Sequence, residues 1–253
     1  MISDGSILRR LPASLDRKQV LFLDGIRHAV EIIDFANRRL TLQLTNVVLK
    51  NQPGPVTRDL FSGAFLDAWA LVDATDRFRC LWQQFPGMHH APPPEGSPTL
   101  SEATQEIRNI RNVADHIAQR MDFVLAHNGT ALGSLTWCTL DPQDPAGVYT
   151  CALIPGTLGA VHTVLVNPTD LPFLNAQSGN IHLAAGGHRA NLSAALPEIA
   201  LRIRQLEENL ESAFEEAGLK GNQAGSDQYI ALRATSGHLE KSKCCLALSR
   251  PGV

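Results

Sequence analysis

Residues 15–50, LDRKQVLFLDGIRHAVEIIDFANRRLTLQLTNVVLK, decide the fold of this chain. Apolar residues recur in this stretch every three or four positions, as they do along one face of an α-helix. They are Val20, Leu23, Ile26, Val30, Ile33, Leu40, Leu44, Val47 and Val48. Ser14 can cap the helix, and the proline and glycine residues at 51–55 end it. The stretch therefore predicts one long amphipathic helix.

Two further segments have the same helical periodicity, at 57–85 and at 101–127. A proline-rich linker at 88–98 joins them, and Asn128-Gly129 is a favourable stop for the second. At about 1.5 Å per residue, the three helices would each be roughly 40–50 Å long. Long neighbouring helices joined by short or medium loops indicate an up-and-down bundle.

The character of the chain changes after residue 130, where short β-prone runs replace the helical pattern. The runs lie at 132–140, 148–154, 160–166, 180–183, 228–234 and 243–248, and a further helix is expected at 193–217. Gly186-Gly187-His188-Arg189, just before that helix, is interpreted as a flexible connector. We therefore predict a mainly α, α+β fold in which 1–129 form the bundle. The β-rich segment 130–253 adds a small antiparallel sheet, and its helix packs back on the bundle as part of one integrated domain.

Bulk composition excludes several classes of protein. The formal charge of −3 over 253 residues excludes a strongly basic protein that coats nucleic acid. No run approaches the roughly 18 apolar residues of a membrane span, so no membrane partner is expected. The five cysteines include no CxxC pair, which predicts reduced thiols in a cytoplasmic protein. We expect no metal and no other cofactor.

The densest polar chemistry lies at 106–116, EIRNIRNVADH, inside the third predicted helix. Asn112 and His116 are four residues apart and can touch on one helical edge. On a straight helix, Arg108 lies about 80° from His116 and Arg111 about 140° away. Geometry alone leaves both arginines open as partners of His116, and Arg111 would need a second helix or a second copy of the chain.

The same residues also allow a purely structural interpretation. Arg111 and Asp115 are spaced as a surface ion pair, and Asn112 with His116 as a hydrogen-bonded helix edge. Asp67, Asp73 and Asp76 of the second helix would either orient the site across the bundle or be solvated charges.

The run Arg111-Asn112-Val113-Ala114-Asp115-His116 resembles the Arg-x4-6-His motif of HEPN domains, in which asparagine often follows the arginine. The resemblance covers roughly residues 15–127 and implies a metal-independent ribonuclease. Arg111, Asn112 and His116 would then be catalytic, with Arg108 and Asn109 binding RNA. The β-rich stretch departs from the family pattern. The resemblance also implies a homodimer, a role as a toxin or defence effector, and a cognate antitoxin or regulatory protein.

The alternative from another functional class is a non-catalytic, HEPN-like dimeric module. In that case the helices form a scaffold, and the chain recognises a protein, a nucleotide or RNA. The position of His116 separates the two hypotheses. A histidine in a solvent-reachable cleft, with an arginine within hydrogen-bond reach in the monomer or the dimer, favours catalysis, whereas a buried and fully paired histidine favours the module.

Overall fold

The fold was analysed in a computed structural model of the chain. The structure describes residues 1–50, 53–86, 98–127, 129–141, 143–144, 147–156, 178–219 and 227–231. Within these residues, none of the helices combines the length and the apolar character that crossing a membrane requires.

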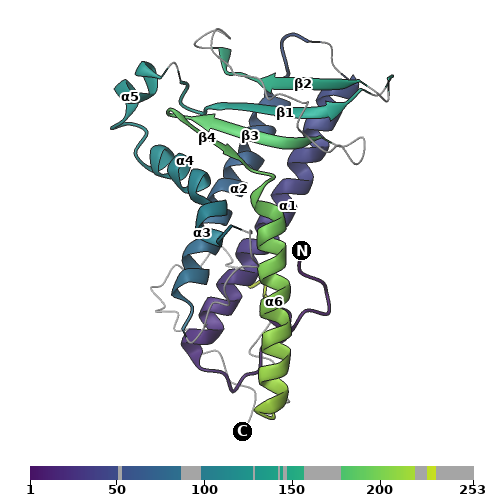
Figure 1. Cartoon of the computed structure of the whole chain (residues 1–253), viewed down its shortest axis with the longest axis vertical. Coiled ribbons are helices and arrows are strands. Elements are labelled where there is room, and N and C mark those ends of the chain that lie inside the picture. Colours follow the sequence, from purple (N-terminus) through teal and green to yellow (C-terminus); the bar gives the residue numbers. More distant parts are fainter. Residues whose placement is uncertain are drawn as a thin grey trace, which may run out of the picture.

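Two long antiparallel helices form the centre of the molecule, α1 (Arg17–Lys50) and α2 (Arg58–Gln84) (Figure 1). Both predictions, at 15–50 and 57–85, are confirmed. The expected cap Ser14 is wrong, because Asp16 caps α1 by accepting from the amides of Lys18 and Gln19. The packing of α1 against α2 accounts for the glycine at position 25, because a Cβ there would lie 3.0 Å from the Leu81 side chain of α2. The glycine therefore permits a close approach of the two helices.

The third predicted helix, at 101–127, is wrong as a continuous element. The structure divides it into α3 (Leu100–Ala103), α4 (Gln105–Asp115) and α5 (Met121–Ala126). The first break is at Thr104, whose buried hydroxyl donates to the carbonyl of Leu100. The second break begins at His116, the C-cap of α4. Its backbone N–H donates to the carbonyl of Val113, three residues earlier, instead of the carbonyl four residues earlier that an α-helix uses. The Thr104 side chain and the turn at His116 thus divide this segment into three helices, although its apolar periodicity continues across both breaks.

The sheet has four antiparallel strands in the order β2-β1-β3-β4. They are β1 (Ser134–Leu140), β2 (Val148–Leu153), β3 (Gly179–Ala185) and β4 (His188–Asn191). The predictions at 132–140, 148–154 and 180–183 are confirmed, whereas residues 228–231 are not a strand. The predictions at 160–166, 232–234 and 243–248 lie outside the described residues, as does the linker at 88–97.

The interpretation of Gly186–Arg189 as a flexible connector is wrong. Gly186 and Gly187 have φ values of 53° and 79°, and they form the two-residue turn between β3 and β4. Positive φ at both central residues defines the turn that matches the twist of a β-hairpin. His188 and Arg189 therefore begin a strand.

The last described helix, α6 (Ala195–Glu216), confirms the prediction at 193–217, and Pro197 lies in its first turn. It lies in contact with α3 and with the N-terminal segment of the chain. The N-terminal segment, with the short helix η1 (Ile7–Arg9), is bound to α6 because the Ser6 hydroxyl donates to the carboxylate of Glu207.

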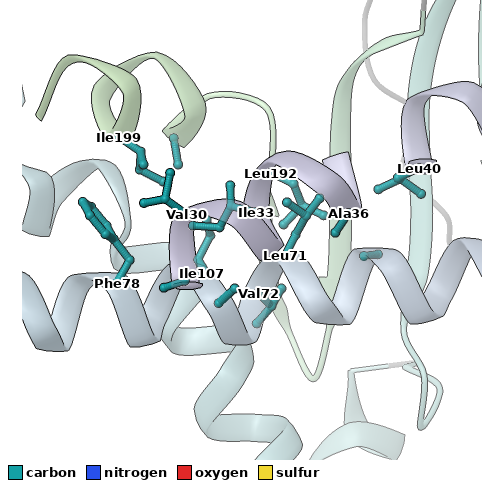
Figure 2. Packing of buried hydrophobic residues seen from close by; sticks show 14 of the residues in the cluster. Val30, Ile33, Ala36, Leu40, Leu71, Val72, Phe78, Ile107, Leu192 and Ile199 are labelled. Atoms are coloured by element: carbon teal, nitrogen blue, oxygen red, sulfur yellow. The ribbon is translucent and has the colours of Figure 1, made fainter. Parts of the chain in front are cut away.

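One cluster of buried apolar side chains joins both halves of the chain. Val30, Ile33 and Leu40 of α1 pack with Leu71, Val72 and Phe78 of α2, with Ile107 of α4, and with Leu192 and Ile199 (Figure 2). Leu135, Trp137, Ile181 and Leu183 of the sheet belong to the same cluster. The sheet lies across one end of the helices, and α4 lies beside α2 with its far end near the sheet (Figure 1).

Candidate functional site

The polar motif lies on α4, an amphipathic helix of 11 residues. Ile107, Ile110 and Val113 are buried. This apolar stripe fixes the rotation of the helix, so that Arg108 and Arg111 point toward α2. Hydrophobic packing therefore decides which motif side chains meet a second helix.

Acidic and basic side chains of α2 and α4 interdigitate in what we call the α2–α4 ion-pair network. Its members are Asp73, Asp76, Arg77, Arg79, Arg108, Arg111 and Asp115. Asp76 is central, because its carboxylate lies 3.3 Å from Arg108, 3.3 Å from Arg111 and 3.8 Å from Arg79. Its side chain is 4% exposed. Four arginines thus share three carboxylates, one of which is buried.

Arg111 is held by three carboxylates at once. Its Nε donates to Asp73 at 3.2 Å, and its Nη1 lies 3.3 Å from Asp76 and 3.1 Å from Asp115. Burial lowers the pKa of Arg111, but the Asp73 hydrogen bond and the three negative charges outweigh burial and raise the pKa above its ordinary value. The side chain remains 34% exposed. Arg111 is therefore a permanently charged, oriented group that solvent can reach.

His116 lies at the C-terminal end of α4, exposed to solvent. Its Nδ1 is 2.9 Å from Oε1 of Gln119. An amide oxygen only accepts, so this contact is compatible with a proton on Nδ1, an arrangement in which Nε2 is the nitrogen free to accept a proton. Within the described part of the chain, the structure shows no contact between His116 and either Arg108 or Arg111. Gln119 was missed by sequence reasoning, although a polar residue three positions after a histidine could have indicated it.

The two asparagines of the motif differ in their surroundings. Asn112 is exposed on the same helix as His116. Asn109 is half-buried, accepts from Gln105 at 3.0 Å and donates to Glu106 at 3.4 Å. Asn109 thus bonds within its own helix, whereas Asn112 is directed to solvent.

The α2 aspartates considered for the site, Asp67, Asp73 and Asp76, separate into two groups. Asp73 and Asp76 contact the motif arginines, as one of the two interpretations expected. Asp67 instead faces α1, where its carboxylate lies 3.3 Å from Arg39 and accepts from Gln43 at 3.2 Å. Burial raises the pKa of Asp67, and the charge of Arg39 partly offsets this.

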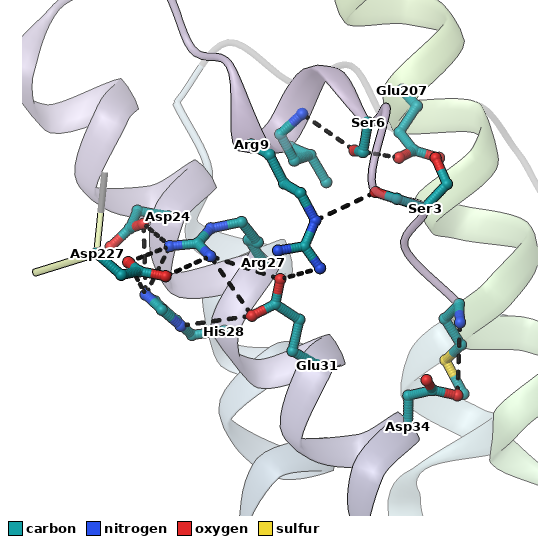
Figure 3. Close-up of polar contacts among 12 residues, drawn as sticks. Ser3, Ser6, Arg9, Asp24, Arg27, His28, Glu31, Asp34, Glu207 and Asp227 are labelled. Carbon is teal, nitrogen blue, oxygen red and sulfur yellow. Dashed lines mark hydrogen bonds and ion pairs between the residues drawn. The ribbon is translucent and has the colours of Figure 1, made fainter. Parts of the chain in front are cut away.

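A second polar cluster surrounds Arg27 of α1 (Figure 3). Asp24, His28 and Asp227 are spaced closely enough to hold a metal ion. However, Nη2 of Arg27 lies 2.8 Å from Asp24, 2.8 Å from Nε2 of His28 and 2.9 Å from Asp227. The guanidinium therefore occupies the position that a metal would take. Helical spacing could have joined Arg27 to its α1 neighbours, but not to Asp227, which is 200 residues away.

His182 of β3 gives the fold a measurable pH dependence. Burial, and secondarily the charge of Arg189, lower its pKa from 6.5 to about 4. As the pH falls, His182 of the unfolded chain is protonated below about pH 6.5, whereas His182 of the folded chain is protonated only near pH 4. The free energy of unfolding therefore decreases as the pH falls from about 6.5 to about 4. Because the ring is partly exposed, we expect about 1 kcal/mol less stability at pH 5 than at pH 7.5 from this group.

The measurement is urea unfolding at the two pH values for the parent chain and for His182→Gln. The difference between the two losses isolates His182 from the carboxyl groups that titrate nearby. Equal losses in both proteins would exclude His182 as the cause.

The chain matches no family model, and comparison with curated proteins and with solved structures found no significant similarity.

Proposed function

We propose that this chain is a HEPN-like endoribonuclease that cleaves RNA without a metal ion and completes its site between two copies of itself. The observation that carries the proposal is the placement of His116, an exposed histidine at the end of the motif helix whose Nδ1 contacts Gln119, so that Nε2 can serve as the base. Exposed Asn112 and partly exposed Arg111 lie on the same short helix. A base, an amide and a fixed guanidinium are the groups that this reaction requires.

The chemistry is a transesterification. Nε2 of His116 removes the proton of a ribose 2′-hydroxyl, and the resulting oxygen attacks the adjacent phosphorus. The 5′-oxygen of the next nucleotide leaves, and the product is a 2′,3′-cyclic phosphate. Arg111 stabilises the charge on the phosphate oxygens, and Asn112 donates to one of them. Arg108 and Asn109 support RNA binding near the phosphate.

A second copy supplies what one chain lacks. The leaving 5′-oxygen needs a proton, and within one described chain His116 is already assigned as the base. The same histidine of a second copy, in its protonated form, can donate that proton. A homodimer therefore gives the reaction both proton-transfer groups, and a cognate antitoxin or regulatory protein would act by blocking that pairing.

Incubation of the purified chain with labelled RNA in excess chelator tests the proposal. We expect cleavage that ends in a cyclic phosphate, and a rate at least 100-fold lower in His116→Ala because general base catalysis is lost. His127→Ala is the matched control, since His127 is also an exposed histidine at a helix C-cap. Cleavage that His116→Ala leaves unchanged would contradict the proposal.

The charge balance of the network favours a second candidate, the non-catalytic dimeric module. Four arginines against three aspartates leave one positive charge in excess, which is little for holding a phosphate. In this case the parent chain does not cleave RNA, and exposed Asn112 and His116 contact a protein, a nucleotide or uncleaved RNA. The same assay separates the two, because the module gives no product with either protein.

A further inference from the structure

Arg27 of α1 binds a carboxylate from a distant part of the chain, that of Asp227 (Figure 3). Its Nη1 donates to Oδ2 of Asp227 at 3.1 Å, and its Nη2 donates to Oδ1 of the same carboxylate at 2.9 Å. Two such bonds fit the planar guanidinium to the planar carboxylate and fix the orientation of both. The contact is therefore bidentate recognition of a carboxylate, and not merely two charges that lie near each other.

The guanidinium of Arg27 is buried and is oriented by its own helix. The Arg27 side chain is 8% exposed. Its Nη2 donates to Asp24 at 2.8 Å, and its Nη1 lies 3.4 Å from the carboxylate of Glu31. These two acids lie about one turn before and one turn after Arg27 on α1, where side chains of a helix are neighbours. They hold the guanidinium in place whether or not Asp227 is bound, so the site is preformed.

The buried guanidinium does not depend on Asp227 for its charge balance. Arg9 lies 2.8 Å from Glu31, so two arginines share this carboxylate. Without Asp227, and apart from His28, the cluster contains two guanidinium groups and the two carboxylates of Asp24 and Glu31. Breaking a buried ion pair is costly when it leaves a charge uncompensated, and the departure of Asp227 does not do so. The contact is therefore one that the fold can release.

On the other side of the contact, Asp227 belongs to an exposed segment, residues 227–231. The Asp227 side chain is 66% exposed, and Tyr229 is 92% exposed. Within the described chain, the hydrogen bonds and ion pairs of this segment are those of Asp227 with Arg27 and His28. The Arg27 hydrogen bond lowers the pKa of Asp227 below its ordinary value, so its carboxylate is charged near pH 7. A single exposed carboxylate thus fastens the segment to α1.

We propose that Arg27 is a carboxylate-binding site on α1, which Asp227 occupies as a releasable clasp and which an acidic side chain of a partner protein occupies when Asp227 leaves. In the closed form, Asp227 lies beside His28, with its Oδ1 3.5 Å from Nε2 of the imidazole. In the open form, the same two Nη groups receive an aspartate or glutamate of the partner. The site is separate from α4, and it stands or falls independently of RNA cleavage.

Limited proteolysis of the parent chain and of Asp227→Asn tests the clasp. Asparagine is neutral and presents only one acceptor oxygen, so the segment should leave α1 more often. Chymotrypsin should then cut after Tyr229 about three- to tenfold faster, as expected when a partly exposed ion pair is lost, and mass spectrometry identifies the product. Asp122→Asn is the matched control, because Asp122 is an exposed aspartate on α5. Equal rates for the parent chain and Asp227→Asn would overturn the clasp.

Two synthetic peptides test the binding site, GSDQYIAL, which is residues 225–232, and GSNQYIAL, which has asparagine in place of the aspartate. In ligand-detected NMR titrations, Asp227→Asn should bind the aspartate peptide about three- to tenfold more tightly than the asparagine peptide. The parent chain should bind the aspartate peptide less tightly, because its own Asp227 competes. Arg27→Lys in the Asp227→Asn chain should abolish the preference, since lysine keeps the charge but lacks the planar fork.

The comparison of the two peptides stays decisive if the Arg27 variant does not fold. It needs only Asp227→Asn, which changes an exposed side chain. Equal binding of both peptides to this protein, or a preference that Arg27→Lys leaves intact in a folded protein, would overturn the proposal.

Discussion

Replacing Asp76 with alanine is expected to lower the free energy of unfolding by about 3 kcal/mol. Removing one member of a buried ion pair leaves its partners uncompensated, which typically costs 3–5 kcal/mol. The Asp76 side chain is 4% exposed and serves Arg79, Arg108 and Arg111 together. The expected loss lies at the low end because two of these arginines reach water, at 39% and 34% exposure. Urea unfolding followed by circular dichroism measures it.

Asp115→Ala is the matched control for this experiment. Asp115 also pairs with Arg111, at 3.1 Å, but its side chain is 50% exposed. Exposed ion pairs contribute about 0–1 kcal/mol, so we expect a loss below about 0.5 kcal/mol. Equal losses from Asp76→Ala and Asp115→Ala would show that burial of Asp76 does not hold α2 and α4 together.

The sequence predicted the long helices well because their cause is local. In α1 and α2 the causes are the apolar spacing, the Asp16 carboxylate that caps α1, and the prolines after residue 50, each of which acts over a few neighbouring positions. The divided third helix was not predictable in the same way. Its breaks depend on the buried hydroxyl of Thr104 and on the turn that starts at His116, and neither interrupts the apolar pattern.

In the candidate site, too, the features with a local cause could be predicted and those that depend on the tertiary fold could not. The residue types of the motif and their common helix can be read from 106–116, and the sequence offers Asp73 and Asp76 as residues that orient the motif across the bundle. The separation of His116 from the arginines could not be predicted from the sequence. His116 is the C-cap of α4, so a projection on a straight helix does not apply to it. The Arg27 cluster needed the tertiary fold, since Asp227 is 200 residues from Arg27.

Replacing Gly186 with alanine is expected to cost about 3 kcal/mol, through two separate effects. Its φ of 53° disfavours any residue with a Cβ, by about 1–2 kcal/mol. The added Cβ would also lie 2.4 Å from Cγ1 of Val113 on α4. A β-branched side chain in a helix has one strongly preferred rotamer, so Val113 cannot turn away cheaply, and overpacking adds about 1–3 kcal/mol. Urea unfolding again gives the value.

Gly218→Ala separates the two effects, because Gly218 has a φ of 63° and nothing within 4 Å of an added Cβ. It should lose only the conformational part, about 1 kcal/mol. In the double variant Gly186→Ala/Val113→Ala the contact is relieved, so its loss should be smaller than the sum of the two single losses. Additive losses would mean that the β3–β4 turn does not press on α4. If they are smaller than additive, the turn of the sheet fixes the position of the helix that carries Arg111 and His116.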